Sequence, residues 1–217
     1  MKPEMERVLR PKEQARRSYN FLSHWYDLFT SSEKKITRTG IQMLDLQPNE
    51  SILEIGCGTG HELVEFSKNI QGGSIISVDI SEEMIKVARK RFQKKVQKRS
   101  VGLCQGDGVF LPLANEQFDA AFLSFTMELF DTPEIICVLN ECRRILKSDG
   151  RIGIVSLAKL ERKSVDIYEW FHRLMPNIID CRPIYLGPAL EETGFKIKES
   201  VIKTMWGLPV EIVIARK

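Results

Sequence analysis

The sequence has few of the residues that build metal centres. Its 217 residues include three histidines and five cysteines, and no two cysteines form a CxxC pair. Structural zinc sites need four such ligands at close spacing, so no metal site is expected. An odd number of scattered cysteines is typical of free thiols in a reducing compartment.

Long apolar runs and a strong charge of one sign are also absent. No run approaches the roughly 18 apolar residues that a membrane-spanning helix needs, and the amino-terminal residues lack the apolar stretch of a secretion signal. The 32 basic and 29 acidic residues leave a net charge of +3, which alone does not indicate a nucleic-acid-binding protein. We therefore expect a cytoplasmic globular protein.

Short apolar runs alternate with longer segments of helical spacing along most of the chain. This alternation predicts βαβ units, and hence an α/β fold with a parallel sheet and helices on both faces. The predicted strands are 51–55, 74–78, 101–105, 118–124 and 151–157, and the predicted helices between them are 61–69, 82–97 and 133–147.

The pattern changes after the fifth strand. A helix is predicted at 164–175 and a short one at 188–193, which ends at Gly194. Two alternating runs, 195–205 and 209–217, follow with only "WGL" between them. Three residues are too few for a helical crossover, so these runs are predicted to pair as an antiparallel hairpin.

A glycine-rich loop follows the first predicted strand, in "ILEIGCGTGHE". A P-loop needs a lysine here, and none lies between Ile52 and Lys68. A dinucleotide site prefers GxGxxG, whereas this loop has GxGxG, with Glu54 before it and His61 in the place of the third glycine. A carboxylate repels phosphate but suits a ligand with an amino group and a positive centre. S-adenosylmethionine is such a ligand.

Two further acids follow the next strands. Asp79 ends the second strand in "ISVDIS", 19 residues after Gly60, where a carboxylate can accept hydrogen bonds from both ribose hydroxyls. Asp107 follows the third strand in "CQGDG", where it can accept from the adenine amine. Each acid alone is a weak signal, because aspartate after a strand is often a helix cap. Together they favour a nucleoside at this edge of the sheet.

Four stretches resemble the successive motifs of class I S-adenosylmethionine-dependent methyltransferases: "LEIGCGTG", "VDIS", "GDGVFLPLANEQFDAAF" and "ECRRILKSDGRIGIV". The resemblance covers about 50–158 and is closest to the branch (methyltransferase type 11) that includes ubiquinone- and menaquinone-biosynthesis C-methyltransferases. It implies a Rossmann-like, seven-stranded, mostly parallel sheet with an antiparallel C-terminal hairpin strand. We expect an N-terminal helical cap at 1–45 and a methyltransferase domain at 46–217, with a lid-like insertion at about 158–187.

The resemblance also implies a set of cofactor-binding residues and the product S-adenosylhomocysteine. The glycine loop would line the methionine end of the cofactor, Asp79 would hold the ribose, Asp107 would meet the adenine, and Tyr26 would cover the cofactor as part of a lid. The predicted cofactor-binding residues are Tyr26, Glu54, Gly56, Cys57, Gly58, Gly60, Asp79, Ile80, Met84, Gly106, Asp107, Gly108 and Ser124.

The methyl acceptor is less well defined by the sequence. Methyl transfer from a sulfonium needs alignment of the reactants, and a general base only if the acceptor loses a proton. The catalytic residue is therefore unknown, with His24, Glu128 and Asp131 as candidates. Candidate acceptor-binding residues are Tyr19, Met127, Trp170 and Arg182.

The leading hypothesis is a methyltransferase acting on a small molecule, such as a quinone-, phenol- or lipid-like compound. The alternatives are an NAD-type oxidoreductase, a non-catalytic cofactor-binding protein, and an RNA or protein methyltransferase. Residues 88–99 hold seven basic residues in twelve, which indicates a solvated helix face or contact with an anionic membrane. With few aromatic residues among them, nucleic acid is disfavoured. The protein is expected to be a monomer or a homodimer.

Overall fold

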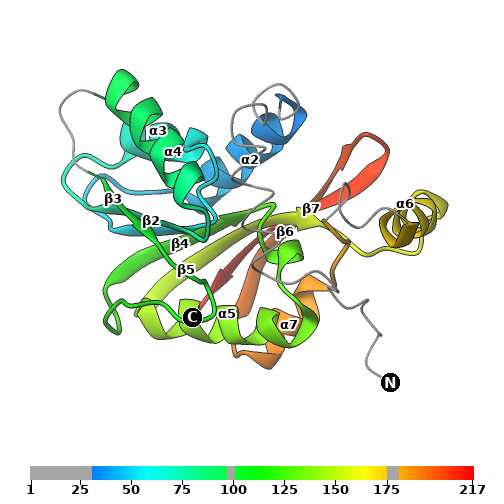
Figure 1. Ribbon diagram of the computed structural model, residues 1–217. Coiled ribbons are helices and arrows are strands. Elements are labelled where there is room, and N and C mark those ends of the chain that lie inside the picture. Colours follow the sequence, from blue (N-terminus) through cyan, green and yellow to red (C-terminus); the bar gives the residue numbers. More distant parts are fainter. Residues whose placement is uncertain (1–30, 97–100, 175–180) are drawn as a thin grey trace.

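The computed structural model describes residues 31–96, 101–174 and 181–217. Seven strands form one sheet in the order β3-β2-β1-β4-β5-β7-β6 (Figure 1). All neighbouring pairs are parallel except the two that β7 makes with β5 and β6. The predicted fold class and the antiparallel hairpin strand are therefore confirmed. The strands are β1 Ile52–Ile55, β2 Ile75–Asp79, β3 Gly102–Gln105, β4 Phe118–Ser124, β5 Leu146–Leu157, β6 Lys196–Met205 and β7 Leu208–Arg216.

Helices cover both faces of the sheet (Figure 1). One apolar cluster joins α5 and α7 to one face, and a second joins α2, α3 and α4 to the other. The helical segments are α2 Ser31–Leu44, α3 His61–Asn69, α4 Glu82–Lys95, the 3-10 turn η2 Met127–Leu129, α5 Thr132–Ile145, α6 Lys163–Leu174 and α7 Leu186–Glu192. The described part of the predicted helical cap is α2.

Strand β4 lies at the centre of the sheet and contributes to both clusters. Successive side chains of a strand point to opposite faces. Ala121 and Leu123 accordingly pack toward α5, whereas Ala120 and Phe122 pack toward α3. The nearly continuous apolar sequence of this strand follows from burial on both faces.

Helix α2 lies very close to the sheet. A Cβ atom added at Gly40 would lie 2.7 Å from Cγ2 of Val155 on β5. Ile41 and Leu44 on the same helix are buried in the apolar cluster beneath it. Glycine costs about 1 kcal/mol in a helix interior relative to alanine, and here it permits the close approach that buries the helix.

Most predicted boundaries shift by one or two residues, and two of the differences have a clear physical reason. Strand β5 begins at Leu146 rather than at 151. Leu146, which is buried and follows the last residue of α5, has an extended backbone and pairs with Phe118, next to a bulge in the pairing of β4 with β5. The β6–β7 hairpin turns on two residues rather than three. Trp206 and Gly207 both have positive φ, 51° and 82°, as the favoured two-residue hairpin turn requires.

Basic residues of the predicted charged run lie on the solvent side of α4. Arg89, Lys90, Lys94 and Lys95 are exposed or nearly so, whereas Phe92 is buried against the sheet. Phe92 therefore offers no face on which a nucleic-acid base could stack. Among the described residues, no helix is long and apolar enough to cross a bilayer.

Candidate functional site

The strand order reverses between β1 and β4, and a cavity lies at the carboxyl ends of these two strands. Ligands of open α/β sheets bind at this kind of position. The cavity has a volume of about 60 Å³ and is formed by α2, the loop after β1 and the end of β4. Its lining residues are Glu33, Lys34, Thr37, Gly56, Cys57, Gly58, Thr59, His61, Glu62, Ser124 and Phe125.

The glycines of the loop have different structural roles. Gly60 has φ of 77°, and a Cβ atom added to it would lie 2.8 Å from the backbone of Ala88 in α4. Gly58 has φ of 48°, and no atom lies within 4 Å of the position of an added Cβ. Gly60 therefore serves helix packing, whereas Gly58 keeps the cavity open on the loop side.

Glu54 is buried at the end of β1, next to the loop. It pairs in register with Ser77 of β2, whose hydroxyl donates a hydrogen bond of 2.6 Å to Glu54 Oε2. The pKa of Glu54 lies well above its usual range, mainly because the side chain is buried and secondly because the acid Glu62 is nearby. A cationic group in the cavity would favour the ionised form of this acid.

Asp79 at the end of β2 is fixed by two backbone donors. Its Oδ2 accepts from the amide of Gly58 at 2.9 Å, and its Oδ1 accepts from the amide of Ser81 at 2.8 Å. Burial raises the pKa of Asp79 to about 6, although both hydrogen bonds act in the opposite direction. Each oxygen retains a lone pair, so the carboxylate can also accept from the two hydroxyls of a ribose.

The predicted adenine-side residues lie around the ends of β2 and β3. Gly106 donates its amide to the carbonyl of Asp79, which brings the loop after β3 to the end of β2. Asp107 begins a tight turn there, and its Oδ1 accepts from the amide of Val109 at 3.1 Å. Gly108 packs closely, because an added Cβ would lie 3.0 Å from Ile55. Met84 is buried in the first turn of α4, and Ile80 precedes that helix.

Ser124 and Cys57 complete the predicted cofactor residues within the described chain. The Ser124 hydroxyl lies 2.7 Å from that of Thr37, which joins the end of β4 to α2 across the cavity. Cys57 is buried, and burial, followed by the charge of Asp79, raises the pKa of its thiol well above the usual value. This thiol is therefore protonated and unreactive at neutral pH.

Glu33 and Glu62 also line the cavity, although they were not among the predicted residues. Burial, followed by the charge of Glu62, raises the pKa of Glu33 to about 7. Burial also raises the pKa of Glu62. Glu62 stands two residues after Gly60 in the first turn of α3, so its position was visible in the sequence. Glu33 is brought to the loop only by the packing of α2.

Of the two acids proposed as catalytic candidates, Glu128 is the one that is fully buried and has a strongly raised pKa. It is fully buried in η2, immediately after β4. Its Oε1 accepts from the amide of Leu157 at 3.3 Å, and its Oε2 has no hydrogen-bond partner in the described structure. Burial raises the pKa of Glu128 to about 8, with Glu33 acting in the same direction and Arg182 against it.

The other acceptor-side candidates are placed differently. Asp131 caps helix α5, where its Oδ1 accepts from the amide of Thr132 at 2.8 Å. Met127 is fully buried in the core, and Arg182 is buried with its Nη2 donating to the carbonyl of Phe130 at 2.8 Å. Trp170 on α6 is 51% exposed. The acceptor-side candidates Tyr19 and His24 lie outside the described residues, as does Tyr26, which was predicted to cover the cofactor.

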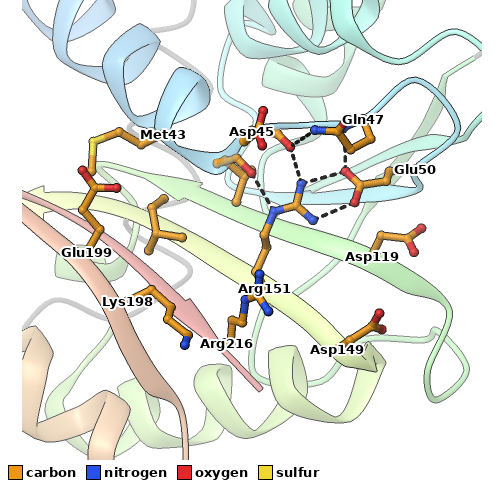
Figure 2. A pocket seen from close by; sticks show the side chains of 12 residues that line it. Met43, Asp45, Gln47, Glu50, Asp119, Asp149, Arg151, Lys198, Glu199 and Arg216 are labelled. Atoms are coloured by element: carbon orange, nitrogen blue, oxygen red, sulfur yellow. Dashed lines mark hydrogen bonds and ion pairs between the residues drawn. The ribbon is translucent and has the colours of Figure 1, made fainter.

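A larger cavity of about 590 Å³ lies at the opposite edge of the sheet (Figure 2). At its centre Arg151 donates to the carbonyl oxygens of Leu44 and Asp45 and to both carboxylate oxygens of Glu50. These contacts fasten the end of α2 to β5. This cavity is near the amino ends of the parallel strands, away from the glycine loop, and its central arginine serves the fold.

The groups at the carboxyl edge fit S-adenosylmethionine better than they fit a dinucleotide. The cavity beside Gly58 is bordered by acids, which match a sulfonium and an amino group, and the fixed carboxylate of Asp79 has lone pairs that could accept from a ribose. A pyrophosphate would be repelled by the same acids. The described residues contain no cluster of three or more potential metal ligands.

Comparison with known proteins agrees with this geometry. Residues 52–150 match the methyltransferase domain family. The demethylmenaquinone methyltransferase of Lactobacillus johnsonii is 27% identical over 62% of this chain and 55% of its own length. An O-methyltransferase of Pyrenophora dematioidea is 29% identical over 77% of this chain and 62% of its own length. The chain thus spans less than two thirds of these relatives.

Solved structures show the same fold. The 1,6-didemethyltoxoflavin-N1-methyltransferase of Burkholderia thailandensis, solved with S-adenosylhomocysteine, has a TM-score of 0.73 at 17% identity, covering 99% of this chain and 93% of its own. Residues 52–150 therefore form a methyltransferase domain of the class I S-adenosylmethionine-dependent type. The predictions of this family and of its cofactor are confirmed.

Proposed function

We propose that this methyltransferase transfers a methyl group from S-adenosylmethionine to a small-molecule acceptor of the quinone or phenol type. The observation that carries the proposal is the position of Asp79, whose carboxylate accepts from the amide of Gly58 beside a cavity lined by acids, at the point where strand order reverses. This arrangement supports a donor that is cationic and carries a ribose.

The protein's part in the reaction is to hold the reactants and exclude water. When bound, the cofactor supplies an electrophilic methyl group on a positively charged sulfur. Asp79 would fix the ribose, and Glu54 and its neighbours would stabilise the positive end. Aligning acceptor and methyl for in-line displacement then supplies most of the rate enhancement. Such a mechanism needs no metal and no covalent enzyme intermediate.

Glu128 is our candidate for the group that handles an acceptor proton. A phenol or an enolised carbon loses a proton when it is methylated. A carboxylate whose pKa is raised to about 8 is a stronger base than an ordinary glutamate, so its ionised form, which grows as pH rises through 8, can accept that proton. Nearby Arg182 would favour the ionised acid. Trp170 and Arg182 remain our proposed acceptor-side contacts.

The names of relatives support the quinone or phenol class. The Lactobacillus johnsonii relative is named for demethylmenaquinone, and the Pyrenophora dematioidea relative for O-methylation. The first name indicates a quinone acceptor, and the second indicates methylation at an oxygen atom. The same chemistry is consistent with a peripheral approach to a membrane that holds a lipid-like quinone, which stays a prediction, as do the cytoplasmic location and the oligomeric state.

The direct test is a screen with isotopically labelled S-adenosylmethionine against naphthoquinols, benzoquinols, simple phenols, amines and a mixed RNA sample. We expect label in a quinol or a phenol, with loss of that signal in Asp79→Ala. Transfer confined to amines or RNA would contradict the proposed acceptor class. Calorimetry with S-adenosylhomocysteine and NAD tests the alternative cofactor, and binding of NAD alone would overturn the proposal.

A further inference from the structure

We propose that Glu33 and Glu62 select the methyl donor, which carries a net positive charge, over its product, which carries no net charge, and that donor binding releases protons from the acids around the cavity. Neither residue was assigned by the sequence motifs. The inference depends on the family's cofactor and is independent of the acceptor, so it can fail while the proposed acceptor class stands.

The geometry places both carboxylates at the mouth of the glycine loop. Glu33 comes from the first turn of α2 and Glu62 from the first turn of α3, and both line the same cavity as Gly58. Behind them lies buried Glu54, held by its hydrogen bond from Ser77. Two acids from two different helices thus line one small space beside the glycine loop, and a third acid is buried next to that loop.

Other charged and titratable groups face these acids. From α2, Lys34 lines the cavity and acts on both Glu33 and Glu62. From α4, Arg91 donates to the carbonyl of Thr59 and acts on Glu62. From β2 and the loop after β1, buried Asp79 and the neutral thiol of Cys57 lie nearby, and His61 also lines the cavity. Two further acids interact with the pair, Glu65 of α3 with Glu62 and Glu128 of η2 with Glu33. The nearby cations therefore balance the acids only in part.

The protonation of these acids follows from their crowding. Burial, and secondly the charge of Glu62, raises the pKa of Glu33 to about 7 and holds the pKa of Glu54 above its usual range. Burial also raises the pKa of Glu62. Without a cation in the cavity, part of the cluster is protonated at neutral pH. A cation that enters favours the ionised forms, so protons leave for solvent as it binds.

The donor and the product differ in charge at one atom. The donor carries a positive sulfonium, an ammonium and a carboxylate, for a net charge of +1. When the methyl group is transferred, the sulfur keeps its bonding electron pair and becomes a neutral thioether, so the product has a net charge of zero. The acids then lose the attraction to the sulfonium and take protons back from solvent. The cluster therefore makes the protein bind the product more weakly than the donor.

Calorimetry on the intact protein tests this inference without any acceptor. Titrations with S-adenosylmethionine and with S-adenosylhomocysteine are compared at pH 6 and pH 8, each in two buffers that differ in heat of ionisation. We expect proton release with the donor and less with the product. We also expect the donor-to-product affinity ratio to rise about tenfold between the two pH values, as about one unit of pKa change on one acid implies.

Two variants and a control locate the effect. Glu33→Gln and Glu62→Gln should each weaken donor binding about tenfold while changing product binding less than about threefold, and should reduce the proton release. Glu83→Gln, on the exposed face of α4, should change neither. Thermal melts establish that each variant is folded.

Several results would overturn the inference. Equal weakening of donor and product in both variants would show that the acids act on the shared amino group and not on the sulfur. An affinity ratio of the unaltered protein that stays flat from pH 6 to pH 8 would do the same without relying on any variant. Normal binding in either variant would show that its acid does not face the cofactor.

Discussion

The Oδ2 atom of Asp79 lies 2.9 Å from the backbone nitrogen of Gly58, so one carboxylate ties the end of β2 to the open side of the glycine loop. The residue that is proposed to hold the ribose therefore also shapes the loop that faces the methionine end. Cofactor affinity and loop geometry depend on the same side chain.

Replacing Asp79 should reveal both roles. Asp79→Ala removes the acceptor of two backbone amides and of the ribose hydroxyls, so we expect S-adenosylhomocysteine to bind at least about tenfold more weakly, since hydrogen bonds to charged groups contribute roughly 1.5–3 kcal/mol. Asp79→Asn keeps one acceptor oxygen and should lose less stability. Isothermal calorimetry and thermal melts measure these effects. Asp149→Ala at the opposite cavity is the matched control, and unchanged affinity in Asp79→Ala would show that the ribose lies elsewhere.

The two glycines of the loop should respond differently to alanine. Gly60→Ala forces a methyl group against the backbone of Ala88 in addition to a positive φ, so we expect a loss of about 2–4 kcal/mol in the free energy of unfolding. Gly58→Ala meets no neighbouring atom and should lose about 1–2 kcal/mol. Its methyl group would enter the cavity and weaken cofactor binding about tenfold or more. Equal stability losses in urea titrations would contradict these assigned roles.

Glu128 should make the protein less stable as pH rises. Its pKa is raised from 4.5 to about 8 in the folded state, so between these values the folded protein binds more protons than the unfolded chain does. The free energy of unfolding then falls with rising pH. Glu128→Gln removes this dependence, and we expect it to be more stable than the unaltered protein by about 2–5 kcal/mol at pH 8.5, with little difference at pH 4.5.

Denaturant titrations at the two pH values measure the Glu128 effect. Glu199→Gln on the exposed surface of β6 is the control and should stay within about 0.5 kcal/mol at both. A Glu128→Gln variant that is destabilised equally at both pH values would instead indicate an ionised, well-paired acid. If Glu128 also accepts the acceptor's proton, the variant loses the alkaline rise in methyl transfer while its cofactor affinity is unchanged.

Replacing Arg151 should lower the stability of the protein without changing its affinity for the cofactor. Arg151→Leu removes the donors to two carbonyl oxygens at the end of α2 and leaves Glu50 without its ion-pair partner, so we expect a loss of about 2–4 kcal/mol in the free energy of unfolding. Affinity for S-adenosylhomocysteine should change less than about twofold. Lys198→Ala, which lines the same cavity (Figure 2), should be nearly neutral for stability. A large loss of cofactor affinity in Arg151→Leu would show coupling between the two edges of the sheet.

The central strands and the helices between them could be predicted from the local pattern of apolar residues in the sequence. The alternation of apolar runs and helical spacing gave the strands to within a few residues, because burial on both faces makes each central strand almost wholly apolar. The start of β5 was missed because Leu146 continues the apolar period of α5, and only its pairing with Phe118 makes it a strand residue.

The position of a candidate site residue could be read from the sequence only where that residue lies beside the glycine loop or at the end of a neighbouring strand. Glu54 and Asp79 end strands next to the glycine loop, so their position follows from the order of the sheet. Glu62 stands two residues after Gly60, so its position could also have been read from the sequence, whereas Glu33 reaches the cavity only through the packing of α2. Burial of Glu128 depends on distant neighbours such as Arg182, which sequence spacing does not reveal.

The contact between Gly40 and Val155 has a practical meaning for experiments on fragments. Because α2 covers the sheet at that distance, a fragment that starts at residue 46 would expose the apolar surface of β4 and β5, including Phe122. Such a fragment would self-associate through that surface. Studies of the minimal cofactor-binding unit should therefore retain Ser31–Leu44.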